Sequence, residues 1–307
     1  MTDSDNLALP FDLRARYGAG HRRALVLGGG GIFFIAWQVS YLRELQRRGV
    51  DLGQATVVVG TSAGSVVAAM LAGDRLGLAS KELSVMAKLP AVIAAMAPSG
   101  DLTPSQARAV DLFREATDAH PTTVREIGYA ALAADAVPAA KLHRSVASLV
   151  AKRSWPAQSL MITTVDAYTG ERLVLRANSG VPVSRAAAAS SSVPGLFSPQ
   201  PVLDRRCMDG GVSGSGTHAD LAVGAERVVI LSLGAENPAR EAMMTIQPNS
   251  LPKEADAVRD AGGEVFVRGP LETNIETLMS PTSVPSAIEM GVNQAAGDAD
   301  ALRAFWN

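Results

Sequence analysis

The sequence predicts an α/β fold with a mainly parallel sheet, and two consecutive strand–turn–helix units carry this prediction. In the first unit, the apolar residues 24–27 lead into four glycines and then into apolar residues at helical spacing. In the second unit, three valines at residues 57–59 precede a glycine-rich turn and an apolar stretch at residues 66–72. Parallel strands need crossover connections, which are usually helices, so two such units in a row indicate parallel pairing.

The helix of the first unit is defined by Ala36, Val39, Leu42 and Leu45, and it ends before Gly49. The second unit has a competing interpretation, because residues 55–73 carry no charge and approach the roughly 20 residues of a membrane span. The β-branched valines and the glycines after them interrupt such a helix. We therefore interpret this stretch as a buried strand, a tight turn and a buried helix.

The rest of the chain continues the α/β pattern after a helical interruption. Residues 1–20 are expected to form an N-terminal arm and residues 21–307 a single domain, in which residues 75–155 form a helical insertion or cap. Beyond it, the pattern predicts strands at residues 159–165, 172–175, 226–233 and 264–267, short strands at 202–203 and 207–208, and helices at 183–192 and from 285 onward.

The composition excludes several classes of function. Lys+Arg 28 against Asp+Glu 30 leaves a net charge of −2, and aromatic residues are only 5%, so nothing favours nucleic-acid binding. A single cysteine, Cys207, excludes an intrachain disulfide and a cysteine-based zinc site, and we expect no metal and no other cofactor. The N-terminus is polar and acidic, unlike a secretory signal, which predicts a cytoplasmic protein.

The motif with the clearest chemistry is Gly60-Thr61-Ser62-Ala63-Gly64, of the form G-x-S-x-G. It stands directly after the valine strand and directly before an apolar helix, which is the context of a nucleophile elbow. Gly60 and Gly64 allow the backbone to approach closely on either side of the serine. The end of the helix favours negative charge that develops near Ser62. The alternative is an ordinary glycine turn with a capping serine.

The four-glycine loop also lies between a strand and a helix. Such a loop offers free N–H groups that hold a phosphate or stabilise an oxyanion. A dinucleotide fingerprint requires a further glycine where this chain has Phe33 or Phe34, and a phosphate-binding loop of the Walker type requires a lysine that is absent. The oxyanion interpretation therefore leads.

A nucleophilic serine needs a base, and the residues leave two candidates. Among four histidines, only His218 lies near a glycine-rich turn late in the chain. Asp209 is the other candidate, because it follows an apolar pair and precedes Gly210 and Gly211 at the predicted end of a strand. A lone Asp-Gly is otherwise a common turn.

The chain resembles the patatin-like phospholipase family in three motifs that follow one another in the family's order. They are the glycine loop, G-x-S-x-G and Asp-Gly-Gly. Residues 186–197 resemble the family's Ala/Ser-rich segment ending in Pro-x-x-Phe, and residues 165–171 and 217–222 also fit. The resemblance runs from about residue 24 to residue 233. It implies a three-layer α/β/α fold and a serine lipid acyl hydrolase that works through an acyl-enzyme without a catalytic histidine.

The family pattern also implies roles for individual residues. Ser62 would be the nucleophile and Asp209 its base, and the backbone of Gly29, Gly30, Gly31 and Ile32 would form the oxyanion hole. His218 falls where relatives usually carry Asn, which favours a structural or pocket-edge role. Relatives continue the glycine loop with a small or basic residue and a glycine, whereas this chain has Phe33 and Phe34. These bulky residues are expected to crowd or to line the acyl site.

Two further hypotheses stay open at this level. The same serine and aspartate would serve an acyltransferase, and a relative impaired by Phe33 and Phe34 would bind lipid without turnover. The expected partners are a lipid or ester substrate and a membrane surface contacted transiently, which would place the protein in the cytoplasm or at the membrane periphery. Nothing in the sequence sets the head group, the acyl length or the oligomeric state.

Overall fold

The computed structural model describes residues 7–89, 101–151, 154–156, 159–237, 245–246 and 250–307. Within these residues, eight strands form one sheet in the order β5-β6-β3-β2-β1-β7-β8, with β4 paired to β3. The strands are β1 (Arg23–Leu27), β2 (Val57–Gly60), β3 (Ser159–Asp166), β4 (Arg172–Leu175), β5 (Gln200–Val202), β6 (Arg205–Asp209), β7 (Arg227–Leu231) and β8 (Glu264–Arg268). β1, β2, β3, β7 and β8 pair in parallel, whereas β4, β5 and β6 pair antiparallel.

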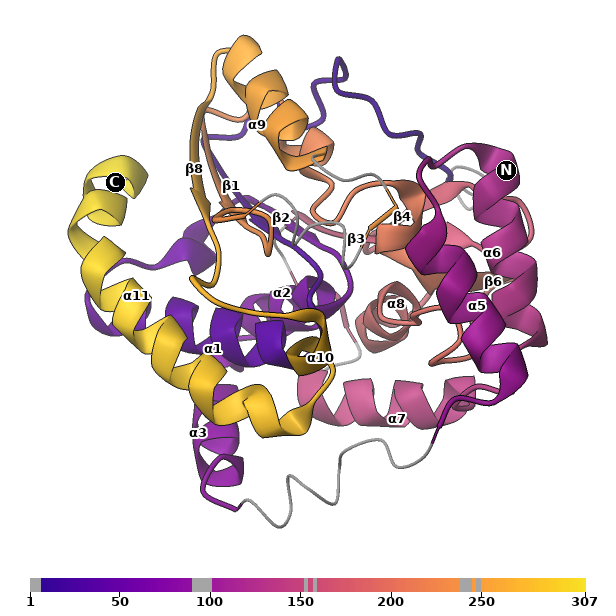
Figure 1. The fold of residues 1–307 in the computed structure, drawn as a ribbon. Helices are drawn as coiled ribbons and strands as arrows, with labels where there is room; N and C mark the ends of the chain where they lie inside the picture. Colours follow the sequence, from indigo (N-terminus) through magenta and orange to yellow (C-terminus); the bar gives the residue numbers. More distant parts are fainter. Residues whose placement is uncertain (1–6, 90–100, 152–153, 157–158, 238–244, 247–249) are drawn as a thin grey trace.

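Helices cover both faces of this sheet (Figure 1). They are α1 (Gly31–Arg47), α2 (Ala63–Ala72), α3 (Leu76–Met86), α5 (Pro104–Glu115), α6 (Pro121–Ala133), α7 (Ala139–Val150), α8 (Val183–Ser190), α9 (Ser250–Asp260), α10 (Ile275–Leu278) and α11 (Val284–Trp306), with short 3-10 turns η2 (Leu52–Gln54), η3 (Gly210–Ser213), η4 (Ala219–Ala222) and η6 (Pro281–Ser283). The predicted α/β class with a mainly parallel sheet is confirmed.

The alternation of side chains along β1 shows why the sheet is covered on both faces. Leu25 and Leu27 pack into the larger core with α1, α2, α8 and α11, whereas Ala24 and Val26 pack into a second core with α9 and η4. Strand side chains point alternately to opposite faces, so an all-apolar strand needs a cover on each side. Figure 1 shows α9 on one side of the sheet and α1, α2 and α11 on the other.

The segment expected as an insertion or cap forms short helices. α3 packs against α1, α7 packs against α8 and α2, and α5 pairs with α6. Residues 90–100 and 152–153 of this segment lie outside the described residues. Whether residues 75–155 act as a cap, and whether residues 21–307 form one domain, stay predictions.

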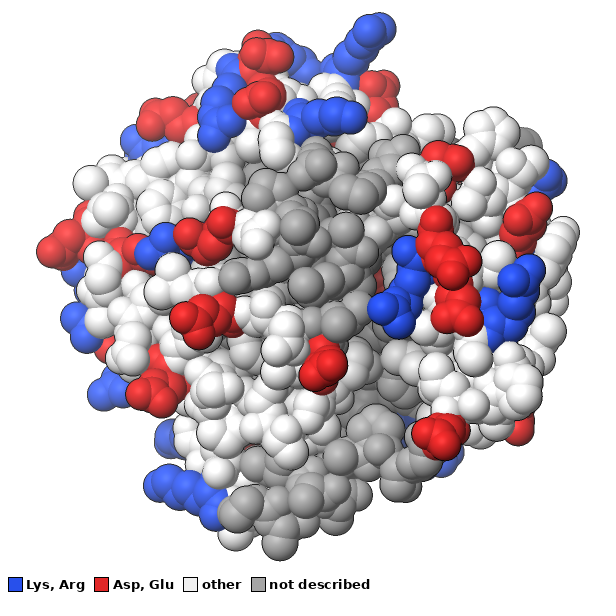
Figure 2. Space-filling view, in the orientation of Figure 1, with Lys and Arg blue, Asp and Glu red and all other residues white. Residues whose placement is uncertain are grey.

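The competing membrane interpretation finds no support in the helices. The charge-free stretch forms β2, the turn at Ser62 and α2, as the sequence predicts. Within the described residues, no helix is both long and apolar enough to cross a membrane. On the face shown in Figure 2, acidic and basic side chains intermingle around the periphery and do not gather into a field of one sign.

Candidate active site

Ser62 lies in a strained turn between β2 and α2. Its backbone has φ 51° and ψ −122°, which places a non-glycine residue at positive φ. A Cβ added to Gly60 would lie 2.7 Å from the Ser65 Cα, and one added to Gly64 would lie 2.0 Å from the Leu27 carbonyl oxygen. Only glycine fits at both positions, so the sequence itself produces the elbow. Strain of this kind persists where the surrounding structure determines it and is frequent at active sites.

The backbone of Ser62 is held by three other serines. Its N–H donates to Ser190 Oγ at 2.8 Å, and its carbonyl oxygen accepts from Ser65 Oγ at 2.6 Å and from Ser191 Oγ at 3.2 Å. The side chain of Ser62 makes no capping hydrogen bond to α2, so it is left for other chemistry. Sequence reasoning gave Ser190 and Ser191 no role, although both belong to the Ala/Ser-rich segment.

Asp209 ends β6 and lies next to β3. Its N–H donates to the Ser192 carbonyl oxygen at 2.9 Å, and its Oδ1 accepts from the Gly211 N–H at 2.9 Å. The residue is only 2% exposed, and burial raises the pKa of its carboxyl group to about 7. Because the charged form loses water on burial, the proton is held more tightly. The raised pKa brings this carboxyl group near neutrality, where a general base is most useful.

The hydroxyl of Ser62 is the side-chain partner that opposes the pKa rise of Asp209. Oδ2 of Asp209 is nevertheless buried without a hydrogen bond of good geometry to any described residue. The two observations agree if the hydroxyl lies near the carboxylate without ideal alignment. Catalytic hydrogen bonds are often long or poorly aligned before substrate binds. The structure thus brings Ser62 and Asp209, 147 positions apart in the sequence, to one place.

The glycine loop lies beside the serine. A Cβ added to Gly29 would lie 3.1 Å from the Ser62 Cβ. The N–H of Gly29 donates to the Gly216 carbonyl oxygen at 3.0 Å, so this amide is already engaged. Within the described chain, the N–H groups of Gly30, Gly31 and Ile32 donate to no protein carbonyl. They lie at the N-terminus of α1, where unpaired N–H groups and the helix dipole favour an anion.

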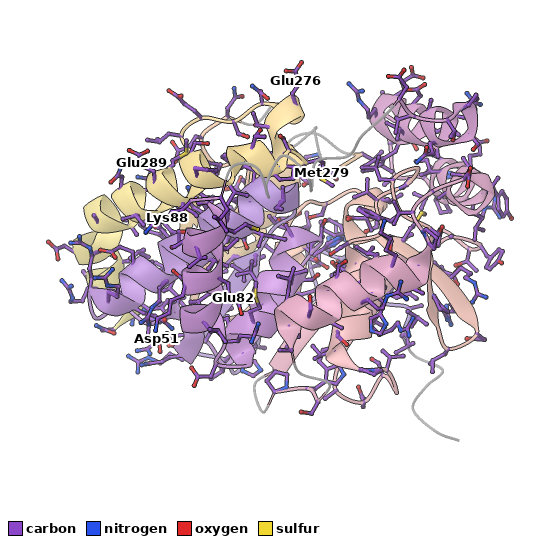
Figure 3. The ribbon with its side chains drawn as sticks, turned by 90° about the horizontal axis from the view of Figure 1, so that it is seen from below. Asp51, Glu82, Lys88, Glu276, Met279 and Glu289 are labelled. Atoms are coloured by element: carbon purple, nitrogen blue, oxygen red, sulfur yellow. The ribbon has the colours of Figure 1, made fainter. Side chains whose placement is uncertain are left out.

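The start of α1 also contacts the segment after α10. Gly31 has φ 63°, and a Cβ there would lie 2.7 Å from Met279 Sδ. Met279 is labelled in Figure 3, which shows it at the end of α10 beside the start of α1. This contact lies beyond the residues that the sequence analysis assigned to the site.

Phe33 and Phe34 lie inside α1 and avoid the positive φ of the loop. Gly30 and Gly31 make the turn before them, so no bulky residue has to adopt a glycine conformation. Phe34 is fully buried and stacks on Trp37, with ring centroids 5.4 Å apart. Phe33 is 3% exposed. Their role in an acyl pocket stays a prediction.

His218 is buried and bonded away from the serine. Its Nδ1 lies 3.1 Å from an Arg172 guanidinium nitrogen, and its Nε2 lies 3.1 Å from the Gly210 carbonyl oxygen. Burial, and then the positive charge of Arg172, lower the pKa of His218 to about 3. A neutral imidazole with both nitrogens engaged is poorly suited to accept the Ser62 proton. Among the residues described, no group of three or more His, Cys, Asp or Glu side chains could hold a metal ion.

The chain belongs to the patatin-like phospholipase family, because the family's sequence model matches residues 25–223, more than half of the chain. VipD from Legionella pneumophila matches with a TM-score of 0.42 and 14% identity, over 98% of this chain and 72% of that one. The type III effector protein ExoU matches with a TM-score of 0.39 and 16% identity, over 92% of this chain and 53% of that one. No curated protein matches this chain. The family match confirms the resemblance seen in the sequence.

Proposed function

We propose that this protein is a serine lipid acyl hydrolase in which Ser62 is the nucleophile and Asp209 its general base. The observation that carries the proposal is the pairing of a strained elbow serine with a buried carboxyl group of raised pKa. Such a carboxylate takes a proton from a neighbouring hydroxyl more readily than an exposed one does. Membership of a phospholipase family supports a lipid ester as the substrate class.

The reaction follows from these roles. Asp209 takes the proton of the Ser62 hydroxyl while Oγ attacks the ester carbonyl carbon, and the carbonyl oxygen gains negative charge. The N–H groups of Gly30, Gly31 and Ile32 are the proposed donors to this oxyanion. The C–O bond to the alcohol breaks, and the alcohol leaves with the proton from Asp209. Water then gives a proton to Asp209 and attacks the carbonyl carbon of the acyl-enzyme. The bond from this carbon to Ser62 Oγ breaks, Asp209 returns the proton to Oγ, and the carboxylic acid leaves.

The test is an ester panel of increasing acyl length, together with phospholipid and lysophospholipid micelles. We expect Ser62→Ala and Asp209→Asn each to lower kcat by about 10³-fold or more while the circular dichroism spectrum stays unchanged. Matched controls are Ser148→Ala and Asp204→Asn, because both side chains lie exposed on the surface. Both controls should retain wild-type turnover.

Two outcomes would redirect the proposal. If Asp209→Asn kept near-normal turnover while Ser62→Ala lost it, another group would be the base. If wild type bound lipid micelles but no fluorophosphonate probe labelled Ser62, the protein would be a lipid-binding relative. Transfer of the acyl group to added glycerol or thiol in preference to water would identify an acyltransferase using the same residues.

A further inference from the structure

Arg172, at the start of β4, is the hub of a buried hydrogen-bond network. Its side chain is 2% exposed, and Nη1 donates to Asp220 Oδ1 at 2.8 Å and to His218 Nδ1 at 3.1 Å. Nε and Nη2 donate to the carbonyl oxygens of Leu9 and Pro10, each at 2.7 Å. A buried guanidinium is tolerated when its donors are satisfied in this way.

The direction of these bonds fixes the tautomer of His218. A guanidinium only donates, so His218 Nδ1 must be the acceptor and carry no proton. The ring proton is therefore on Nε2, which donates to the Gly210 carbonyl oxygen at 3.1 Å. Gly210 directly follows Asp209, and the next N–H, that of Gly211, donates to Asp209 Oδ1. The network that begins at Arg172 thus ends on the turn that carries the proposed base.

The loop that carries His218 is fixed independently. His218 has φ 57°, and its N–H donates to Ser215 Oγ at 2.7 Å. Glu254 of α9 accepts hydrogen bonds from Ser215 Oγ and from Thr217 Oγ1. In the same loop, the Gly216 carbonyl oxygen accepts from Gly29. One loop therefore contacts both the Asp209 turn and the glycine loop.

The N-terminal arm closes the network on its outer side. The Phe11 ring lies edge-on to His218, with centroids 6.2 Å apart, and the Arg172 guanidinium lies 5.6 Å from the same ring. The arm is paired to β4 by backbone hydrogen bonds at Leu9 and Val174. Together these contacts keep His218 out of water, and it is 0% exposed.

We propose that Arg172 and His218 are positioning residues that hold the Asp209–Gly211 turn, and with it the Asp209 carboxylate, in place beside Ser62. This inference rests on the proposed function. Without the imidazole, the Gly210 carbonyl oxygen loses one of its two side-chain donors and keeps only the Ser213 hydroxyl, at 2.8 Å, and water gains access beside the turn. The carboxylate then becomes less well oriented and better hydrated. Because His218 is fully buried and both of its ring nitrogens are engaged within the protein, we expect it to make no contact with substrate, so kcat should fall while KM stays close to the wild-type value.

A pH profile separates positioning from mere structural support. Among the described residues, Arg172 of β4 is the charged group that contacts His218, and Asp220 of η4 pairs with Arg172, while Phe11 and Ser213 are neutral neighbours of the imidazole. Asp209 owes its raised pKa to burial, opposed only by Ser62 and Gly211. Hydration of the turn should lower this pKa, so the acid limb of kcat/KM should move to lower pH. A loss of stability alone would not move it.

The informative variants are His218→Gly and His218→Asn, because both residues tolerate the left-handed backbone. Glycine removes both hydrogen bonds, whereas the amide of Asn can accept from Arg172 and donate toward Gly210. We expect His218→Gly to lower kcat roughly 10- to 100-fold, with KM within about twofold and the acid limb shifted down. His218→Asn should restore most of kcat and the wild-type acid limb.

The matched control is Arg268→Lys, because Arg268 is also an arginine in an ion pair, with Asp298, away from the site. Arg172→Lys keeps the positive charge but loses the planar guanidinium group and its several N–H donors, so it should lower kcat. Arg268→Lys should leave kcat unchanged. Arg172→Lys also serves as the test if His218→Gly does not fold, as judged by its melting curve. The positioning role alone would be overturned if folded His218→Gly or folded Arg172→Lys kept the wild-type kcat and the wild-type acid limb. In that outcome Ser62→Ala and Asp209→Asn would still be inactive. An active Ser62→Ala would overturn the proposed function and this inference with it.

Discussion

At the scale of single residues, Asp209 combines a proposed catalytic use with a cost in stability. No charged side chain is among the causes of its raised pKa, which comes from burial. A buried carboxylate without a cationic partner is unfavourable when ionised. The environment that makes Asp209 a stronger base therefore also makes its ionised form a burden on the folded protein. Both consequences depend on pH, and both are measurable.

We expect Asp209 to link stability and activity to pH in opposite directions. The pKa of Asp209 in the folded protein, about 7, lies above the ordinary value of 3.8, so folding takes up a proton between these pH values. The free energy of unfolding should therefore fall as pH rises through this window. Over the same window kcat/KM should rise, because the ionised form is the base.

Asp209→Asn should remove this stability cost. One pKa unit corresponds to about 1.4 kcal/mol, so the variant should be about 2–4 kcal/mol more stable than wild type at about pH 8. At about pH 3 the two proteins should be nearly alike, because this pH lies below both pKa values and the carboxyl group is then largely protonated in both states. Urea unfolding at the two pH values, beside the exposed control Asp204→Asn, measures this difference. Equal stability of Asp209→Asn and wild type at about pH 8 would contradict it.

At the scale of elements, the elbow depends on how closely α2 approaches the end of β1. The Gly64 N–H donates to the Gly28 carbonyl oxygen at 3.1 Å, and a Cβ at Gly64 would overlap the Leu27 and Gly28 carbonyl groups. Backbone groups cannot yield as a flexible side chain can. The helix would have to move away from the sheet, and Ser62 would move with it.

Gly64→Ala should therefore lower the free energy of unfolding by about 3 kcal/mol or more. The control is Gly297→Ala in α11, where an added Cβ has nothing within 4 Å. There alanine should be neutral or stabilise by about 0.5–1 kcal/mol, because it favours the helix. Thermal unfolding of both variants measures the contrast. Similar melting temperatures for the two would mean that α2 does not need this close approach.

The order of elements was predictable because local pattern determines it. The valine strand, the glycine turn and the apolar helix around Ser62 formed as predicted, since periodicity and glycine placement act within a few residues. α9 had no assignment in the sequence analysis. The burial of its carboxylate Glu254 is explained by donors that lie 35 to 39 positions away in the sequence, namely the hydroxyls of Ser215 and Thr217 and the N–H of Ala219.

Local sequence pattern could not predict the residues that support the site. The sequence predicts Arg172 only as the first residue of a strand, and nothing near it in sequence marks it as the partner of His218. Its contacts join residues 46 to 163 positions apart. Only tertiary structure brings such pairs together. His218 shows the intermediate case, because its place near a glycine-rich turn drew attention but its tautomer and partners did not follow.

At the scale of the whole molecule, the sheet reaches beyond the part that matches the family. The matched residues end at 223, whereas β7 follows at Arg227–Leu231 and lies between β1 and the edge strand β8. α11 then packs along α1, where Trp37 Nε1 donates to Gln294 Oε1 at 2.9 Å and Tyr41 donates to Asp298 at 2.9 Å. The glycine loop therefore lies between a strand and a helix that both depend on the C-terminal third of the chain.

Trp306 at the end of α11 tests whether this third unfolds together with the site. The side chain is 1% exposed, its Nε1 donates to the Asp51 carbonyl oxygen at 3.0 Å, and the Arg23 guanidinium lies 5.7 Å from its ring. Trp306→Ala should lower the free energy of unfolding by about 3–5 kcal/mol, whereas Leu271→Ala, at a side chain that is 52% exposed, should stay within about 0.5 kcal/mol. Because α11 packs on the helix that starts at the glycine loop, calorimetry should show one transition at lower temperature, with loss of ester hydrolysis at the same midpoint. A separate early transition that left hydrolysis intact would show that α11 unfolds independently of the site.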